Sequence, residues 1–289
     1  MNGGPPRIGI NFLAEEGCRA AALPLFEEGA IDAIEWAIDT RWGLGDARNE
    51  IPAWAEEVLD LYAEEDALYG HGVWFSFLNA RLEPRQERWL AQLADECKRR
   101  HYRHVTEHFG WMHGTLLPAP RTEGAVAVGI DRLQRLAAAT GGPVGLENLA
   151  ASLNRADAEE QGEFLDAILA PGDHLLILDV HNVWTQAVNL GLDAEALLET
   201  YPLDRVREVH VSGGAWYRAR GRSVRTDSHD GPVPDAVPPL LARALALCPN
   251  VEVVFLERRG QTLDSEDDRV RWRDDFRAMR AIVEEACRA

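Results

Sequence analysis

The amino-acid sequence predicts an α/β fold in which eight strand–helix pairs close into a (β/α)8 TIM barrel. Two observations predict it: short apolar runs alternate with amphipathic helical stretches along the whole chain, and most of these runs end in a histidine or a carboxylate. The chain has 289 residues, and a barrel of this kind needs about 250. No linker or low-complexity tract interrupts the pattern, so residues 1–289 are expected to form a single barrel domain. A doubly wound open sheet is the alternative, but it seldom reaches eight such units.

The strand candidates are short and mostly apolar, as expected of strands that are buried on both faces of a parallel sheet. They are 7–11, 31–36, 68–74, 103–108, 143–148, 175–180, 206–212 and 251–257. The helix candidates between them lie near 15–28, 50–65, 84–100, 122–140, 157–169, 192–200, 235–247 and 266–287.

Local signals support several of these boundaries. Pro52 and Pro84 lie near first turns, where the missing N–H of proline costs no hydrogen bond. Asp157 and Asp193 are candidate N-caps. The run Gly141-Gly142-Pro143 predicts that a helix ends immediately before the fifth strand.

Composition excludes some classes of partner. A formal net charge of -18 argues against nucleic acid, whose backbone requires neutralising Lys and Arg side chains. No apolar stretch is long enough to span a membrane, and the N-terminus MNGGPPRIGI lacks the layout of a secretion signal, so a cytoplasmic location is expected. The cysteines form no CxxC motif and are interpreted as small buried residues in a reducing compartment. They are Cys18, Cys97, Cys248 and Cys287.

The strongest functional signal lies where the strand candidates end. Six of them run into ionisable residues, and a further Asp-Ser-His follows in the loop between the last two strands. The residues are His71, Glu107, His108, Glu147, Asp179, His181, His210, Asp227, His229 and Glu257. The active sites of such barrels are built at the carboxyl ends of the strands. Gathering this many charges at one mouth is costly without cations, so the pattern predicts more than one bound metal ion.

The spacing and chemistry of these residues narrow the choice of metal. Asp-x-His occurs twice, as Asp179/His181 and Asp227/His229, and residues two apart on an extended strand point to the same side. Taken alone, His71 is equally compatible with a packed histidine, and Asp179/His181 with a helix cap or a buried salt bridge. Glu257, followed by Arg258 and Arg259, is compatible with an ion-pair cluster. The mixed nitrogen and oxygen donors, without cysteine, suit iron, manganese or zinc. Oxygen chemistry, hydrolysis and isomerisation all remain open at this point.

Aromatic and basic residues suggest how a substrate is held. Five tryptophans fall at or just past strand ends, where they are expected to wall a cavity or to pack at its rim. They are Trp36, Trp74, Trp111, Trp184 and Trp216. The long segment 215–234 carries arginines that could clamp a substrate carboxylate, although a solvated loop fits the pattern equally well. These are Arg218, Arg220, Arg222 and Arg225.

The order of these motifs resembles the multinuclear non-haem iron-dependent oxidative enzymes, a family that includes the methanobactin-maturation oxidase and other enzymes that modify ribosomally made peptides. The matching stretches are RIGIN, HGVWFS, TEHFGW followed by LLPAPRT, GLENLA, LDVHNVW, EVHVSGG, DSHDGPVP and FLERRG. Each stretch is weak alone, but their order extends over about 250 residues, the length of a whole barrel.

The resemblance implies a xylose-isomerase-like barrel that binds two or three iron ions in a mixed Fe(II)/Fe(III) state and uses O2 as co-substrate. It implies metal ligands at His71, His108, Glu147, Asp179, His210, Asp227, His229 and Glu257. Within this set, the catalytic residues are expected to be His71, Glu147, Asp179 and His229. Residues expected to contact the cofactor, by binding it or by orienting a ligand, are Asn148, Trp111, Trp184 and Arg225. The implied partners are a precursor peptide, with cysteine as one candidate target, and a separate protein that binds its leader.

The chain departs from the family pattern in three places. Glu107 precedes the histidine of the fourth strand, where the family often has Asp. The sixth strand candidate ends in DVHN instead of DVNN, and a later family histidine is replaced by Leu190, so His181 is a candidate replacement ligand. The ending ERRG replaces an EWD-like ending, which indicates a subgroup with another substrate.

Other activities on the same barrel remain alternatives at this stage. They are a divalent-metal sugar isomerase or epimerase, and a metal-dependent hydrolase such as a phosphodiesterase of the endonuclease IV type. The absence of a lysine at a strand end counts against an aldose–ketose isomerase, and the charge of -18 makes DNA a poor partner. A binding protein without catalysis is a third class, but it needs no open polynuclear site.

Overall fold

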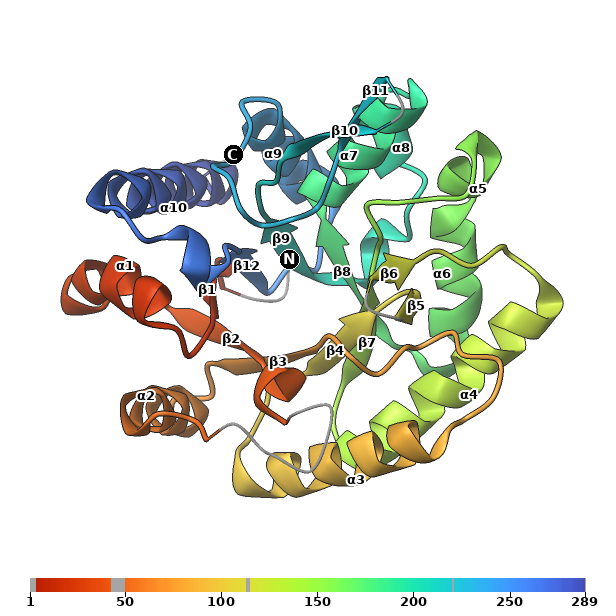
Figure 1. Cartoon of the computed structure of the whole chain (residues 1–289), viewed down its shortest axis with the longest axis horizontal. Helices are drawn as coiled ribbons and strands as arrows, with labels where there is room; N and C mark the ends of the chain where they lie inside the picture. Colours follow the sequence, from red (N-terminus) through yellow and green to blue (C-terminus); the bar gives the residue numbers. More distant parts are fainter. Residues whose placement is uncertain (1–3, 43–49, 113–114, 220, 289) are drawn as a thin grey trace.

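A computed structural model describes residues 4–42, 50–112, 115–219 and 221–288. Eight parallel strands close a barrel in the spatial order β1-β12-β9-β8-β7-β4-β3-β2 (Figure 1), which confirms the predicted fold class. The strands are β1 (Arg7–Phe12), β2 (Ala33–Ala37), β3 (Leu68–Gly72), β4 (Val105–His108), β7 (Val144–Glu147), β8 (Leu175–Asp179), β9 (Val206–Val211) and β12 (Val253–Leu256). Each coincides with one of the strand candidates, because a short apolar run between two polar helices is buried most fully as a strand of the barrel.

Helices form a ring outside the strands (Figure 1). They are α1 (Glu16–Glu27), α2 (Ala53–Glu64), α3 (Pro84–Arg99), α4 (Glu123–Thr140), α5 (Arg155–Glu159), α6 (Gln161–Leu169), α7 (Val180–Leu190), α8 (Ala194–Leu198), α9 (Val237–Leu247) and α10 (Glu266–Ala286). Short 3-10 turns are η1 (Ile38–Arg41), η2 (Ala170–Gly172), η3 (Leu203–Arg205) and η4 (Gly260–Thr262). Two hairpins are added, β5 (Trp111–Met112) with β6 (Leu116–Leu117), and β10 (Trp216–Ala219) with β11 (Arg222–Arg225).

The prediction was wrong around Asp179. Helix α7 begins at Val180, directly after β8, whereas the sequence pattern predicted an extended strand up to 180 and a helix only from 192. The side chain of Asp179 accepts a hydrogen bond from the backbone N–H of Asn182 at 2.7 Å, so it caps α7 and turns the chain at this point. His181 therefore lies in the first turn of a helix and does not follow Asp179 along a strand.

Of the two predicted helix caps, one is confirmed and the other is wrong. Asp193 accepts from the N–H of Ala196 at 2.9 Å and caps α8, as predicted. Asp157 does not cap its helix, because Asn154 accepts the N–H of Asp157 and starts α5 three residues earlier. Gly141 ends α4 with a φ of 67°, a left-handed conformation that glycine adopts without strain.

The apolar core lies in two places. Most of it fills the space between the strands and the surrounding helices. A small second cluster of Ala33, Tyr69, Val253 and Phe255 lies inside the barrel. These four side chains plug the barrel near the amino ends of its strands. The remaining interior, toward the carboxyl ends, is left to polar side chains.

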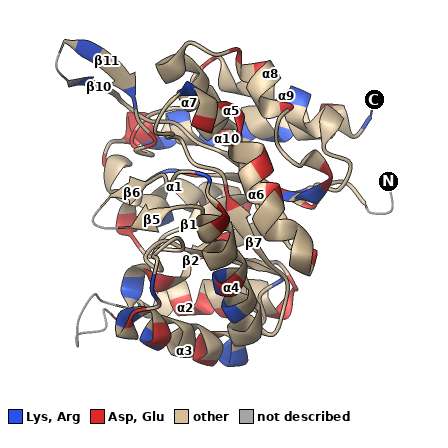
Figure 2. Cartoon of the chain, turned by 90° about the vertical axis from the view of Figure 1, so that its right-hand side faces the viewer, with Lys and Arg blue, Asp and Glu red and all other residues tan. Residues whose placement is uncertain are grey.

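The two ends of the barrel differ. Both termini lie at one end of the molecule, and the β10–β11 hairpin projects at the other (Figure 2). Among the described residues, no helix is both long enough and apolar enough to cross a bilayer.

Candidate metal centre

Carboxylate and imidazole donors converge at the carboxyl ends of the barrel strands. They form four groups, in each of which the donor atoms lie within 4.8 Å of one another. The groups are His71/His108/Glu147, Glu147/Asp179/His210/Glu257, Asp179/Asp227/His229 and Glu35/Glu208/His210. The first three contain all of the predicted ligands except His181. Glu147 and Asp179 each belong to two groups, so the three positions are contiguous.

The first group joins three neighbouring strands. Oε2 of Glu147, at the end of β7, lies 3.1 Å from Nε2 of His71 on β3 and 3.4 Å from Nε2 of His108 on β4. The opposite ring nitrogens are engaged elsewhere: Nδ1 of His71 contacts the hydroxyl of Thr106 at 2.8 Å, and Nδ1 of His108 donates to the carbonyl of Gly72 at 3.0 Å. A neutral imidazole that donates through Nδ1 presents a free lone pair on Nε2, the form that binds metals.

The second group places two carboxylates near the same nitrogen of the His210 ring. Nδ1 of His210 lies 3.2 Å from Oε2 of Glu257 and 3.8 Å from Oε1 of Glu147. Oδ1 of Asp179 is occupied by the cap on α7, and its Oδ2 has no hydrogen bond within the described residues. All four side chains are buried.

The third group comes from the loop between β11 and α9. Nε2 of His229 lies 2.7 Å from Oδ1 of Asp227, and both approach Asp179. His229 has a φ of 50°, an uncommon conformation for a histidine, and the backbone N–H of Arg259 donates to its carbonyl at 2.9 Å. Within the described residues His181 joins none of the four groups, although its Nδ1 lies 3.4 Å from Oδ1 of Asp227.

Many of these buried donor atoms lack a hydrogen bond within the described residues. They are Nε2 of His71, Oδ2 of Asp179, Nδ1 of His181, Nδ1 of His210, Oδ1 of Asp227, Nε2 of His229 and Oε2 of Glu257. Unpaired buried polar atoms are rare and costly, and here they point toward one another instead of into apolar packing. Lone pairs facing a common point are the arrangement that a cation satisfies, so the residues fit bound metal ions.

The close approach of carboxylates and imidazoles shifts the pKa values of several of these groups in the metal-free centre. Burial lowers the pKa of His71, but Glu35 and Glu147 outweigh it and bring this pKa to about 10. Burial likewise opposes protonation of His210 and His229, but facing carboxylates, led by Glu257 and Asp227 respectively, hold both pKa values well above the usual range. Burial and then the charge of Asp227 raise the pKa of Asp179 well above its usual value. Without metal, protons therefore provide part of the missing positive charge.

Metal binding is consequently expected to strengthen as the pH rises. Histidines whose pKa is raised carry a proton at neutral pH, and a metal ion must displace it. Each displaced proton should increase the apparent affinity about tenfold per pH unit below the raised pKa. Titrations of the metal-free protein with Co(II) at pH 6.5 and 7.5, with proton release measured by calorimetry in two buffers, test this. An affinity that does not change with pH would contradict the proton-loaded state of these histidines.

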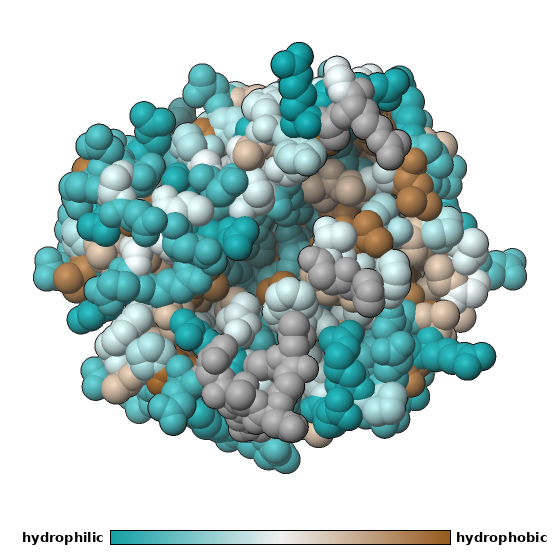
Figure 3. All heavy atoms as spheres, viewed as in Figure 1, coloured by the Kyte–Doolittle hydropathy of each residue, from teal (hydrophilic) through white to brown (hydrophobic). Residues whose placement is uncertain are grey.

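A cavity opens from the centre to the surface. It has a volume of about 630 Å³ and is lined by metal-centre residues together with Trp74, Arg41, Arg259 and Met112. A hollow with mostly hydrophilic walls is visible at the middle of this face (Figure 3). A second cavity of about 460 Å³ shares Leu116 and Asp227 with the first and is bordered by α7 and β11.

The predicted aromatic wall is only partly present. Trp74 lines the large cavity, while Trp111 and Trp216 lie in the hairpins and are 41% and 54% exposed. Trp36 does not face the cavity: it is buried in the outer core, with its ring 6.2 Å from that of Phe12. Its strand places it on the outward side, because inward and outward positions alternate.

Arg225 is buried at the base of the β10–β11 hairpin. Its guanidinium lies over the rings of Trp184 at 5.0 Å and Trp216 at 5.9 Å, and its Nη2 is 3.5 Å from Nε2 of His181. Asn189 holds the backbone of Arg225 through two hydrogen bonds. The other predicted basic residues, Arg218 and Arg222, are exposed on the hairpin, and Arg220 lies outside the described residues.

Two asparagines beside the ligands hold the backbone and a carboxylate in place. Asn148 accepts the N–H of Asp179 at 2.7 Å and donates to its carbonyl at 3.1 Å, so it joins the ends of β7 and β8. Asn182 donates to Oε1 of Glu147 at 3.2 Å and to the carbonyl of Asn148 at 3.0 Å. These contacts orient Asp179 and Glu147, the two carboxylates shared between groups.

Residues deeper in the barrel were missed from the sequence. Glu35 on β2 and Glu208 on β9 are fully buried, and both contact His210. Asn11 on β1 donates to Oε2 of Glu35 at 2.9 Å. The alternation of side chains along REVHVS and AIEWA could have indicated them, because Glu208 and Glu35 occupy inward positions within otherwise apolar strands. A prediction based on the strand ends alone does not include such positions.

Solved structures define the class of fold. An L-ribulose 3-epimerase aligns with a TM-score of 0.60 at 14% identity, covering 98% of this chain and 96% of that one. A xylose isomerase-like TIM barrel protein from Mycobacterium smegmatis in complex with magnesium aligns with a TM-score of 0.54 at 14% identity, covering 98% and 97%. At such low identity the likeness concerns the fold alone, which is the xylose-isomerase-like barrel.

Sequence comparison assigns the family. The model of the RiPP precursor modification enzyme family MbnB/TglH/ChrH matches residues 48–268. A UPF0276 protein of Bordetella bronchiseptica is 36% identical over 223 residues, which cover 72% of this chain and 75% of that protein. A UPF0276 protein of Acaryochloris marina is 31% identical over 182 residues, 61% of this chain and 64% of that protein. The chain belongs to this family of enzymes that modify precursors of ribosomally synthesised, post-translationally modified peptides (RiPPs), which confirms the resemblance noted in the sequence.

Proposed function

We propose that the chain is a multinuclear non-haem iron-dependent oxidase or oxygenase that uses O2 to modify a residue of a precursor peptide, with cysteine as one candidate target. The observation that carries the proposal is the sharing of Glu147 and Asp179 between adjacent donor groups. Shared carboxylates can bridge ions, and an enzyme that needs only one metal ion has no use for such an arrangement.

The donor set supports iron. Nitrogen and oxygen donors without thiolate suit Fe(II) and Fe(III), and oxygen chemistry is typical of histidine–carboxylate iron sites with open positions. His71, His108 and Glu147 would hold one ion, and Glu147, Asp179, His210 and Glu257 a second. Asp179, Asp227 and His229 would hold a third, with His181 beside it. Iron bound there would supply one-electron redox chemistry and a binding site for O2.

The protein supplies orientation and shelter around these ions. Thr106 and Gly72 hold the rings of His71 and His108, and Asn182 holds Glu147. The 630 Å³ cavity is lined by five of the donor residues, His71, His108, Asp227, His229 and Glu257. It is wide enough for one side chain with its flanking backbone. Arg41 and Arg259 line this cavity and are placed to pair with a carboxylate of the peptide.

A separate protein that binds the leader of the precursor is part of the proposal. The support for it is the family resemblance. Affinity purification of the tagged enzyme together with its precursor peptide and a candidate leader-binding protein tests this part. If the enzyme modifies the peptide fully in the absence of any second protein, the partner is unnecessary.

Elemental analysis of protein purified without oxygen or chelator tests the metal. We expect two or more iron ions per chain and a change in the visible absorbance when O2 is admitted, since only a redox-active metal responds to it. Magnesium, manganese or zinc with negligible iron, after expression in iron-rich medium, would contradict the oxidase and favour an isomerase or hydrolase. The magnesium-reconstituted protein, exposed to O2 in the same way, is the control.

A further inference from the structure

A buried carboxylate–imidazole pair lies beneath the metal centre, inside the barrel. Glu208 and His104 are both buried, and Nε2 of His104 contacts Oε2 of Glu208. The other oxygen of Glu208, Oε1, lies 2.6 Å from Nε2 of His210. None of the peptide-modifying chemistry proposed above uses this pair, although it is in direct contact with a proposed metal ligand.

We propose that Glu208 is a positioning residue, which holds the His210 ring so that Nδ1 faces the metal position shared with Glu147 and Glu257, and that His104 anchors Glu208. The inference rests on the proposed metal centre. Its core observation is the division of the His210 ring between two environments: Nδ1 lies toward Glu257 and Glu147 at 3.2 and 3.8 Å, and Nε2 toward Glu208.

This division is the one that metal-bound histidines usually show. A ligating imidazole nearly always donates its second N–H to a carboxylate or carbonyl, which sets the tautomer and the ring orientation and makes the ligand more basic. Oε1 of Glu208 is at hydrogen-bond distance from Nε2, while Nδ1 has no hydrogen bond within the described residues. The ring is therefore held on its inner edge and left free on its outer edge.

Glu35 is the competing partner. Its Oε1 lies 3.2 Å from Nε2 of His210, but this atom makes no hydrogen bond within the described residues, and Asn11 holds Oε2. The shorter, hydrogen-bonded contact belongs to Glu208. A further ion among Glu35, Glu208 and His210 is the alternative. It is disfavoured because the 2.6 Å contact already joins two of its three donors and His104 holds the remaining oxygen of Glu208.

Neighbouring barrel residues pack against Glu208 and His104 on the side opposite the metal centre. Glu208 and His210 are two residues apart on β9, so both point into the barrel. The ring of Tyr69 packs edge-on against His104, with centroids 4.8 Å apart, and also against Phe255 at 5.3 Å. A pair surrounded in this way has little freedom to turn, and the position of His210 follows from it.

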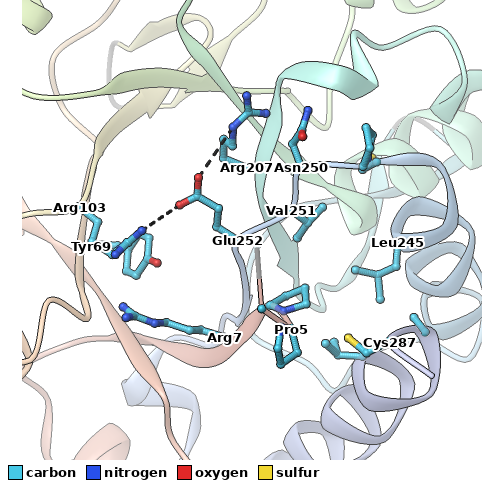
Figure 4. A pocket seen from close by; sticks show the side chains of 16 residues that line it. Pro5, Arg7, Tyr69, Arg103, Arg207, Leu245, Asn250, Val251, Glu252 and Cys287 are labelled. Atoms are coloured by element: carbon cyan, nitrogen blue, oxygen red, sulfur yellow. Dashed lines mark hydrogen bonds and ion pairs between the residues drawn. The ribbon is translucent and has the colours of Figure 1, made fainter. Parts of the chain in front are cut away.

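Tyr69 in turn faces the opposite end of the barrel. It lines a cavity of about 560 Å³ at the amino ends of the strands, together with Arg7, Arg103 and Arg207. Figure 4 shows Glu252 between Arg103 and Arg207, 3.3 Å and 3.9 Å from their nitrogens. The ring of Tyr69 thus separates this cavity from His104 and Glu208. Glu252 lines the cavity and contacts neither His104 nor Glu208 among the ion pairs of the described residues, so it serves as a control.

The test compares Glu208→Gln, Glu208→Ala and Glu35→Gln, with Glu252→Gln as the control. Metal-free proteins are titrated anaerobically with Co(II), and the number of ions, their dissociation constants and the visible absorption of bound Co(II) are recorded, with the thermal midpoint of each metal-free protein. Glu208→Ala should weaken one ion by about 10- to 100-fold and change its absorption band, the usual effect of losing an outer carboxylate. Glu208→Gln keeps an acceptor without the charge, so a smaller loss is expected.

The outcomes separate the possible failures. If the wild-type protein binds no Co(II), the proposed metal centre itself is contradicted, and the role of Glu208 with it. If it binds Co(II) and both Glu208 variants titrate like the wild type, the metal centre is supported and the positioning role of Glu208 is overturned. A fall in the thermal midpoint without any change in Co(II) binding would also overturn the positioning role. Loss of one whole ion in Glu208→Gln and equally in Glu35→Gln would mean that these carboxylates are ligands. Should Glu208→Ala fail to fold, the isosteric Gln variant decides.

Discussion

Replacing Glu147 by glutamine is expected to remove two metal ions at once and to reduce turnover at least about 100-fold, beyond the ~10- to 100-fold typical of residues outside the ligand set. Glu147 belongs to both the His71/His108 group and the Asp179/His210/Glu257 group. Oε2 faces His71 and His108, and Oε1 faces His210 and Asn182. A glutamine keeps the shape but offers one weaker donor oxygen and one N–H that repels a cation.

The measurement is metal content per chain, together with turnover on the precursor peptide. Glu257→Gln is the graded comparison, because Glu257 belongs to only one group and should cost one ion. Glu252→Gln, at the other end of the barrel, should leave the metal content unchanged. An unaltered metal content in Glu147→Gln would remove this residue from the centre and with it the case for bridged ions.

The second large effect is expected from the loop that carries Asp227 and His229. Asp227→Ala or His229→Ala should remove the ion of the third group and abolish turnover, while the barrel stays folded. These residues lie between β11 and α9 and contribute nothing to the strand ladder. Because neither side chain packs in the apolar core, the thermal midpoint of the metal-free protein should move by no more than a few degrees, roughly 1 kcal/mol.

Asp230→Ala is the matched control for this loop. Asp230 is an exposed carboxylate one residue beyond His229, hydrogen-bonded to Ser228 at 2.7 Å and outside the four donor groups. It should retain its metal and its activity. Full metal content in both Asp227→Ala and His229→Ala would exclude the loop from the site, whereas a cooperative loss of all ions would show that the third position supports the other two.

The fold was largely readable from the sequence because its signals are local. Each barrel strand is a short apolar run, and each predicted run coincides with one strand of the barrel. The exception is instructive: the apolar pattern continues from β8 into α7, and periodicity alone does not mark the boundary. The boundary is set by the side chain of Asp179, which caps the helix. The motif Asp179-Val-His181 is compatible with a helix cap as well as with a metal ligand, and the contact with Asn182 shows that Asp179 caps the helix.

The candidate site was predicted in part for the same reason. Strand ends of one barrel meet at one mouth, so eight of the nine histidines and carboxylates expected as ligands fall into the donor groups. His181 does not, because the start of α7 turns it beside Arg225 and Asp227. Glu35 and Glu208 went unnoticed, since a carboxylate in the middle of an apolar strand shows its role only when the barrel closes around it.

The sequence by itself determined the barrel, the mouth at which the candidate donors gather and most of those donors, because strand periodicity and the position of polar residues along each strand are properties of short segments. The tertiary structure alone decided which donors lie within reach of one another, that Nδ1 of His108 is engaged by a carbonyl, and that Nε2 of His210 contacts Glu208. These depend on distances between residues far apart in the chain, from His104 to Glu208 for example, and no local pattern encodes them.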